Sequence, residues 1–342
     1  MILIVAIFII GCTSGTGDEG SEQSLPTTQT RERLIPENID FDAIEITDPF
    51  VLEFGSFSFG IEPLNYEEMD PTMFFDGIFR LTDANNTLLA RGENGSSEDM
   101  VVILKLFVNY EEVAFYVEGI AEADTEFVFL VPALHEVTIP LQLAIDLPEG
   151  DYSHKLTAAF FQSPHLNVSE DEGLRFYGIQ MAMNYDFVYG EGGDIILTVP
   201  HQEASAQIEL PVFLAVSDFI DGVDQEMLYT PFPSPLQVRR GELAELAFLG
   251  NPTARVPDVD DYVLIMMLDW HQIHPNRQPY LLFTANDSGG RLADYDTFTF
   301  LAPEETGLFE FVAIMIPNPT QESFVDIFAP LEMHRFTIEV VD

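Results

Sequence analysis

The chain has 342 residues, 47% of them hydrophobic, so it is long and apolar enough to build folded domains despite a formal net charge of −45. Lys105 and Lys155 are its two lysines, and this scarcity of positive charge excludes the neutralisation of a phosphate backbone, so nucleic acid is not expected as a partner. A single cysteine, Cys12, excludes an intrachain disulfide.

Residues 2–10 form an uninterrupted apolar run that is followed by Gly11 and Cys12. The run is too short to cross a hydrocarbon core about 30 Å thick, which needs about 20 helical residues, and its length is typical of a signal peptide. The sequence Ile9-Ile10-Gly11-Cys12 resembles the lipobox of bacterial lipoproteins, in which the cysteine becomes the lipidated N-terminus after cleavage. The alternative is a buried strand that ends at an incidental cysteine.

The lipoprotein resemblance implies a location as well as a modification. It implies a signal peptide over residues 1–11 and acylation of Cys12, with palmitate among the acyl chains. The protein would then be extracytoplasmic, lipid-anchored to the cell membrane or outer surface. Residues 12–40 are expected to form a flexible tether, because residues 13–37 are rich in Gly, Ser, Thr, Gln and Glu and have little apolar surface to bury.

Beyond residue 40 the sequence predicts β-structure almost throughout. Short runs rich in Val, Ile, Phe and Tyr are separated by Gly, Pro, Asn and Asp, and strands that follow strands without helices favour antiparallel β-sandwiches. The expected strands are 50–59, 73–81, 101–109, 113–118, 126–131, 137–145, 152–161, 175–189, 194–199, 206–216, 243–249, 262–270, 280–284, 296–301, 310–316 and 335–341.

Two passages, 147–152 and 302–309, are Pro/Gly turns that lead through an aromatic residue into an expected strand. They resemble the corner between strands E and F of immunoglobulin-like sandwiches, where a tyrosine hydroxyl bonds back to the turn. Tyr152 supplies the hydroxyl in the first copy, and Phe309 lacks it in the second. In the second copy the resemblance places residues 280–284 as strand D and Trp270 at the end of strand C, near where such domains bury a tryptophan.

The duplicated corner implies two domains. We expect the first β-sandwich over 41–217, long enough to carry inserted strands, and the second, immunoglobulin-like sandwich over 218–342. The domains are expected to meet near 217–236, which contains a cluster of three prolines.

Two sets of residues have the side chains of metal ligands. His271 and His274, with Asp269, offer zinc-ligand types, but residues three apart in a strand point to opposite faces, so convergence needs a turn at 272–273. The alternative is a pair of loop histidines beside a buried Trp270. Two acidic runs offer calcium ligands, although neither has the EF-hand spacing, and solvated loops are the default interpretation. The acidic candidates are Asp218, Asp221 and Asp224 in one run and Asp258, Asp260 and Asp261 in the other.

Catalytic motifs are not apparent in the sequence. Lys105 follows an apolar run and not a glycine-rich phosphate loop, and no serine has the Gly-x-Ser-x-Gly spacing. We therefore expect no catalytic residues, no cofactor, and a non-catalytic binding or scaffold module whose partner is an extracellular or envelope protein or a glycan. The alternatives are an extracytoplasmic hydrolase or lyase with an acidic carboxylate site, and a calcium-binding adhesion-type protein.

Overall fold

The computed structural model is nearly all β-structure in the residues that it describes. Two short 3-10 helices, η3 (Pro252–Ala254) and η4 (Pro275–Arg277), accompany the strands. No helix in this part of the chain is long and apolar enough to cross a membrane. The described residues are 45–46, 57–63, 78–81, 87–145, 152–162, 180–189, 191–193, 195–209, 214–217, 236–254, 259–286, 292–320 and 332–342.

The first sandwich consists of two sheets. Its outer sheet has the strand order β1-β9-β4-β2, with β7 also paired to β9, and its inner sheet has the order β3-β11-β10-β5-β6, with β8 also paired to β5. The strands are β1 (Glu45–Ile46), β2 (Phe57–Pro63), β3 (Ile78–Leu81), β4 (Leu88–Asn94), β5 (Met100–Val108), β6 (Glu111–Glu112), β7 (Phe115–Val117), β8 (Glu126–Val131), β9 (His135–Leu143), β10 (Tyr152–Gln162) and β11 (Gln180–Tyr189).

The second sandwich also has two sheets. Its inner sheet has the order β12-β19-β17-β21-β22-β15, with β18 also paired to β17, and its outer sheet has the order β13-β20-β16-β14. The strands are β12 (His201–Gln202), β13 (Ala206–Glu209), β14 (Leu214–Ser217), β15 (Leu236–Arg239), β16 (Leu243–Gly250), β17 (Asp261–Leu268), β18 (His271–Gln272), β19 (Leu281–Thr284), β20 (Leu292–Leu301), β21 (Gly307–Pro317) and β22 (Glu332–Val341).

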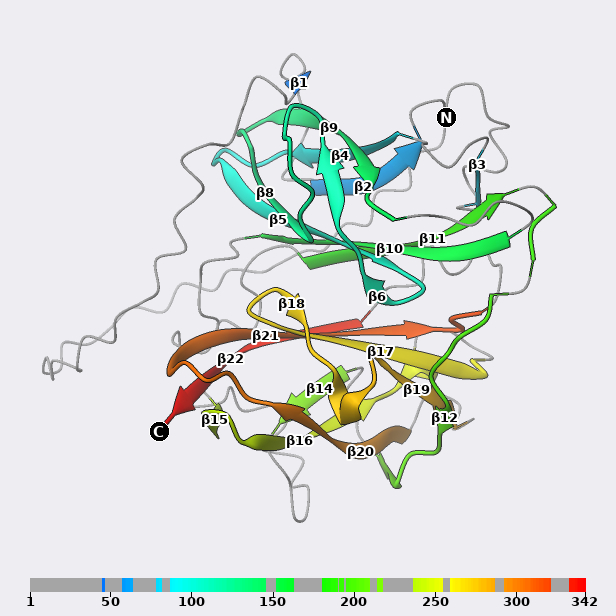
Figure 1. The fold of residues 1–342 in the computed structure, drawn as a ribbon, viewed down its shortest axis with the longest axis vertical. Helices are drawn as coiled ribbons and strands as arrows, with labels where there is room; N and C mark the ends of the chain where they lie inside the picture. The colour runs from blue at the N-terminus through cyan, green and yellow to red at the C-terminus, as the bar shows by residue number, and fades with distance from the viewer. Residues whose placement is uncertain are drawn as a thin grey trace, which may run out of the picture.

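The four sheets stack as layers, with the two inner sheets face to face in the middle (Figure 1). The strand pairs are antiparallel except for β3–β11, β12–β19 and β15–β22 at the sheet edges. The prediction of two antiparallel β-sandwiches is therefore confirmed.

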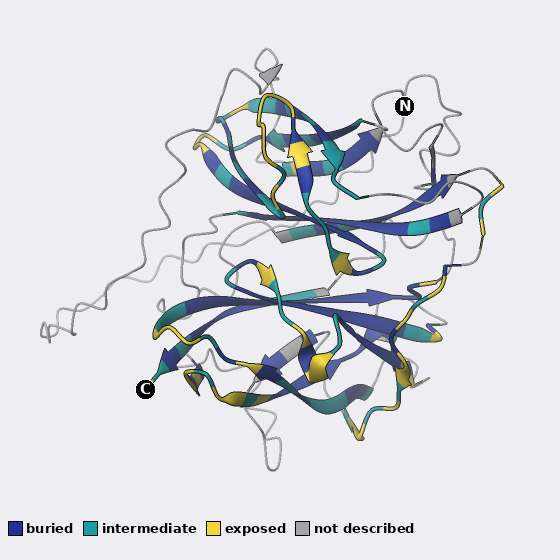
Figure 2. Ribbon diagram, in the orientation of Figure 1, coloured by how far each residue is buried: buried dark blue, intermediate teal, exposed yellow. Residues whose placement is uncertain are grey.

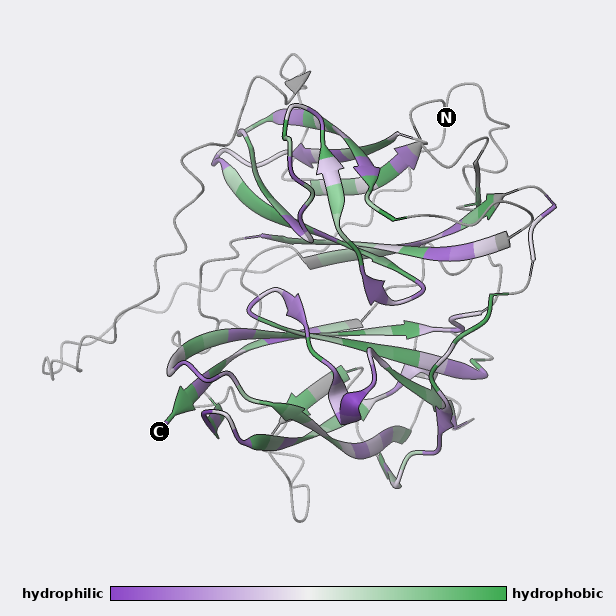
Figure 3. Cartoon of the chain, in the orientation of Figure 1, coloured by the Kyte–Doolittle hydropathy of each residue, from purple (hydrophilic) through white to green (hydrophobic). Residues whose placement is uncertain are grey.

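Side chains alternate between the two faces of the inner strands, and both faces are buried. On β10, Leu156, Ala158 and Phe160 belong to the core of the first sandwich, whereas Ala159 and Phe161 belong to a separate core between the sandwiches. Figure 2 shows the inner strands buried along much of their length, and Figure 3 shows that they are largely hydrophobic. Because the inner sheets are buried on both faces, the sequences of their strands are almost continuously apolar.

The division between the sandwiches lies earlier in the chain than expected. Strands β12, β13 and β14 pair with strands of the second sandwich, and the last strand of the first sandwich, β11, ends at Tyr189. The expected boundary between 217 and 218 is therefore wrong. The proline cluster within 217–236 separates β14 from β15, which both belong to the second sandwich.

Three strand assignments are also wrong. Residues 195–199 are not a strand but run between the sandwiches, where Val199 packs into the core that joins them. The segment expected as strand D is β19, which pairs with β17 and so lies in the sheet of strand C. The single strand expected over 206–216 is two strands, β13 and β14, which lie at opposite edges of the outer sheet. Strands β1, β4, β6, β12, β15 and β18 were not expected.

The structure gives different results for the aromatic residues of the two corner motifs. Phe309 is buried in the core of the second sandwich, in agreement with the packing part of the motif. The side chain of Tyr152 lies outside the described residues. Trp270 is buried as expected, but it belongs to the core between the sandwiches and not to the core of its own domain.

Candidate functional site: the junction of the two sandwiches

The two sandwiches are joined by an apolar core of their own. Strand alternation places every second residue of β5, β10, β17 and β21 on the face that meets the other domain. Most of these side chains are completely shielded from solvent, so the two domains form a single packed unit. The buried members are Ile103, Phe107, Tyr110, Ala159, Phe161, Ala182, Val199, Val263, Ile265, Met267, Trp270, Tyr280, Leu282, Val312, Ile314 and Ile316.

Equivalent hairpin turns lie on both sides of this junction. In the first sandwich Asn109 and Tyr110 connect β5 to β6, with φ angles of 49° and 70°, and in the second Asp269 and Trp270 connect β17 to β18, with φ angles of 50° and 69°. Two consecutive positive φ angles are typical of a type I′ turn. The backbone N–H of Asn109 donates to the Lys155 carbonyl at 2.8 Å, and that of Asp269 donates to the Glu310 carbonyl at 2.7 Å.

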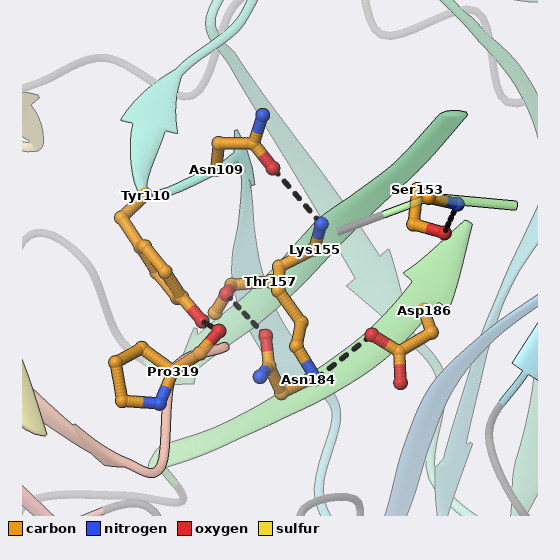
Figure 4. Close-up of polar contacts among 9 residues, drawn as sticks. Asn109, Tyr110, Ser153, Lys155, Thr157, Asn184, Asp186 and Pro319 are labelled. Atoms are coloured by element: carbon orange, nitrogen blue, oxygen red, sulfur yellow. Dashed lines mark hydrogen bonds and ion pairs between the residues drawn. The ribbon is translucent and has the colours of Figure 1, made fainter. Parts of the chain in front are cut away.

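Each turn inserts its aromatic residue into the opposite domain. The Tyr110 hydroxyl donates to the Pro319 carbonyl oxygen at 2.6 Å (Figure 4). The Tyr110 ring packs edge-on against Tyr280, with the ring centroids 5.7 Å apart. In the other direction, Trp270 packs against Phe161 of the first sandwich at 5.2 Å. The contacts are reciprocal, and they therefore fix the orientation of one sandwich against the other.

Gln272 is a polar bridge between the two hairpins. Its side-chain oxygen accepts from the backbone N–H of Glu112 at 2.6 Å. Its side-chain nitrogen donates to the carbonyl oxygens of Tyr110 at 2.8 Å and Pro279 at 2.7 Å. One side chain thus satisfies backbone groups of both domains, which adds directional contacts to the apolar core.

Both lysines of the chain are buried on the inner sheet of the first sandwich. Lys105 forms an ion pair with Glu112, and Lys155 forms one with Asp186 at 2.8 Å, with the Thr157 and Asn184 side chains hydrogen-bonded beside it (Figure 4). Lys105 shares its face of the sheet with the junction residues of β5, and Lys155 shares its face with those of β10.

A third buried ion pair lies on the facing sheet. Arg335 donates through Nε to Glu310 at 2.7 Å and through Nη1 to the Gln162 carbonyl oxygen of the first sandwich at 2.8 Å, and its guanidinium lies 5.0 Å from the Trp270 ring centroid. Burial raises the pKa of Glu310 to about 7, an effect that outweighs the opposing influence of the Arg335 guanidinium. Arg335 thus connects both domains to the inserted tryptophan.

A hollow of about 490 Å³ opens beside the hairpin tips. The first sandwich contributes Glu111 and Glu112, and the connecting segment contributes Thr198. The wall from the second sandwich consists of Gln272, His274, Arg277 and Pro279. The hollow is therefore bounded by acidic side chains on one domain and basic side chains on the other.

The histidine candidates lie at this junction but do not form a metal site. The turn falls at Asp269-Trp270 and not at 272–273, so His271 lies exposed in β18 and His274 lies exposed before η4. In the described part of the chain, no group of three His, Cys, Asp or Glu residues is placed to hold a metal ion. The zinc hypothesis is not supported at this position.

The acidic candidates are divided between described and undescribed parts of the chain. The backbone N–H of Asp260 donates to the Asn318 side-chain oxygen at 3.1 Å, and Asp261 lies 3.9 Å from His201. Burial raises the pKa of Asp261. The lipidation candidate Cys12 and the calcium candidates Asp218, Asp221, Asp224 and Asp258 lie outside the described residues.

Comparison with known proteins gives likeness in fold alone. No family model and no curated protein matches the sequence. Among solved structures, the C-terminal domain of the Streptococcus pyogenes antigen I/II-family protein AspA is 9% identical, covering 77% of this chain and 94% of its own, with a TM-score of 0.24. Red sea bream transglutaminase is 10% identical over 84% of this chain, with a TM-score of 0.23, and the match spans 31% of that enzyme. TM-scores this low support no statement about function.

Proposed function

We propose that this chain is a non-catalytic, extracytoplasmic binding or structural module in which two β-sandwiches act as one rigid body on a lipid anchor at Cys12. The observation that carries the proposal is the face-to-face packing of the inner sheets through the reciprocal Tyr110 and Trp270 contacts. An interface this apolar holds the domains in one orientation, and a fixed orientation suits presentation of a surface to a partner.

The use of the buried cations also supports a structural role. Lys105, Lys155 and Arg335 are each paired with a carboxylate at the junction, where they are withdrawn from solvent. Their contribution is to the specificity of domain packing, because a buried ion pair that loses one partner is strongly destabilising. The partner that we propose is an envelope or extracellular protein or glycan.

The anchor is tested by expressing the full chain in a bacterial host that processes lipoproteins. We expect the wild-type protein to enter the detergent phase and to carry acyl chains on Cys12, and Cys12→Ser to lose both properties. Ser14→Ala, two residues along the same segment, is the matched control and is expected to behave as wild type. An acyl-free wild-type protein, or a Cys12→Ser protein that still partitions into detergent, would overturn the anchor.

The module itself is tested separately, with purified envelope fractions and matched glycans as probes. Saturable binding of the folded chain, lost on denaturation, is the expected result. Turnover of a glycan probe by the purified protein would contradict the non-catalytic assignment.

A further inference from the structure

We propose that the hollow between the hairpin tips is a binding site for a small zwitterion, an amino acid or short peptide with free ammonium and carboxylate groups. The inference goes beyond the proposed function, and it does not depend on whether Cys12 carries lipid.

Each domain's wall of the hollow carries a charged side chain that forms no ion pair with a described residue. Glu111 is exposed on the first sandwich and Arg277 on the second, and both line the same hollow of about 490 Å³. Their charged atoms do not come within the 4.0 Å of an ion pair, and neither side chain forms an ion pair with any other described residue. Opposite charges thus face one space without meeting across it.

Contacts of the junction set the position of the two walls. Gln272, which lines the hollow, connects the hairpins, and Glu112 is already paired with the buried Lys105. These contacts set the relative position of the two hairpins, and in this arrangement Glu111 and Arg277 form no ion pair across the hollow. A ligand with both charges would complete each wall, whereas a simple ion would satisfy one wall and be repelled by the other.

The backbone of the turn at Asn276 and Arg277 has an unusual conformation. Asn276 and Arg277 have φ angles of 52° and 65°, a left-handed conformation that is uncommon for a bulky residue. The Asn276 side-chain oxygen accepts from the backbone N–H of Thr299 at 2.9 Å and from its hydroxyl at 3.2 Å, which keeps the loop in this conformation. Arg277 lines the hollow from this turn, and its guanidinium is the group best suited to a carboxylate.

The remaining lining fits the rest of such a ligand. The Thr198 hydroxyl donates to Tyr280 and can still accept a hydrogen bond, the His274 ring can bond to a peptide group, and Pro279 offers a small apolar surface. The volume lies within the range of small-molecule sites. A zwitterion also has no net charge, so the strongly acidic chain does not repel it as it would an anion.

The test is calorimetric titration of the full chain with the dipeptide alanyl-alanine. Saturable binding is expected, with much weaker binding of N-acetyl-alanyl-alanine, which lacks the ammonium, and of alanyl-alanine amide, which lacks the carboxylate. Titrations with alanine and trialanine show which ligand length the site binds most tightly. Equal binding of the capped and free dipeptides, or no binding of any of these probes at about 10 mM, where a millimolar Kd would give near saturation, would overturn the proposal.

Substitutions at the hollow and away from it test whether the ligand binds there. Arg277→Gln and Glu111→Gln are each expected to weaken binding about tenfold, the effect of losing a hydrogen bond to a charged group. Arg240→Gln and Glu118→Gln make the same charge changes at exposed positions that do not line the hollow, and they are expected to bind as wild type. Binding that survives both hollow variants would refute the site. A failed titration leaves the partitioning result for Cys12 unchanged, so the two proposals can be separated.

Discussion

The contact between Tyr110 and Pro319 can be removed by deleting a single oxygen atom, which is expected to weaken the packing of the two sandwiches. Tyr110→Phe keeps the ring against Tyr280 and removes only the hydroxyl that donates to the Pro319 carbonyl oxygen at 2.6 Å. Tyr110 is completely buried, so no water replaces the lost donor. The expected cost is about 1–2 kcal/mol, the loss of a buried hydrogen bond that leaves an acceptor unsatisfied.

Equilibrium unfolding in urea measures this cost. The midpoint is expected to fall by about 0.5 M with an unchanged slope, because the variant exposes the same surface on unfolding. Tyr116→Phe is the matched control: Tyr116 is 44% exposed on the first sandwich, and its variant is expected within about 0.5 kcal/mol of wild type. If Tyr110→Phe were as stable as the control, the hydroxyl would not hold the domains together and the reasoning would be refuted.

Three further predictions concern the buried charges and metal binding. An amine-reactive ester is expected to leave Lys105 and Lys155 unmodified in the native protein and to label both in urea, since both are buried; native labelling at either position by peptide mass mapping would contradict their burial. The raised pKa of Glu310, about 7 against an ordinary 4.5, means that the folded state binds more protons than the unfolded state between these pH values. Stability should therefore fall as pH rises from about 4.5 to 7, more steeply in wild type than in Glu310→Gln, and equal slopes in urea melts at several pH values would argue against the shift. Thermal melts at constant ionic strength are expected to show no calcium-specific stabilisation relative to magnesium, and a midpoint several degrees higher with calcium alone would revive the acidic runs as a metal site.

The two-sandwich fold could be predicted from the sequence because its signals are local. Strand-length apolar runs, turn residues between them and the repeated corner motif depend on a few neighbouring residues. Strand 126–131 agrees with β8, and strand 152–161 differs from β10 only at its end.

The domain boundary could not be predicted from the position of prolines and other turn residues alone. Prolines within 217–236 suggest a linker, but β14 and β15 on either side belong to opposite sheets of one sandwich. The actual connection passes through residues 191–200, where Val199 is buried and partly apolar sequence imitates a strand. Composition does not distinguish a connection packed into an interface from a strand.

The junction between the sandwiches is indicated in the sequence by the periodicity of two strands. Residues 101–108 and 262–268 are apolar almost without alternation, which is typical of strands buried on both faces and indicates a second packing partner. Lys105 lies inside the first of these runs, where a charged residue implies a buried ion pair. No sequence pattern indicated that Glu111 and Arg277 line the same hollow, because this depends on how two hairpins distant in sequence pack together.

The fixed orientation of the two sandwiches is tested most directly by a distance measurement between them. Spin labels at Ser97→Cys and Thr306→Cys, both exposed and on different domains, can be introduced into the full chain with Cys12→Ser, which removes the one native thiol. Pulsed electron paramagnetic resonance is expected to give one narrow distance distribution, unchanged on dilution, because the inner sheets form a packed core. A broad or multimodal distribution would mean that the sandwiches move independently and would contradict the rigid two-domain unit.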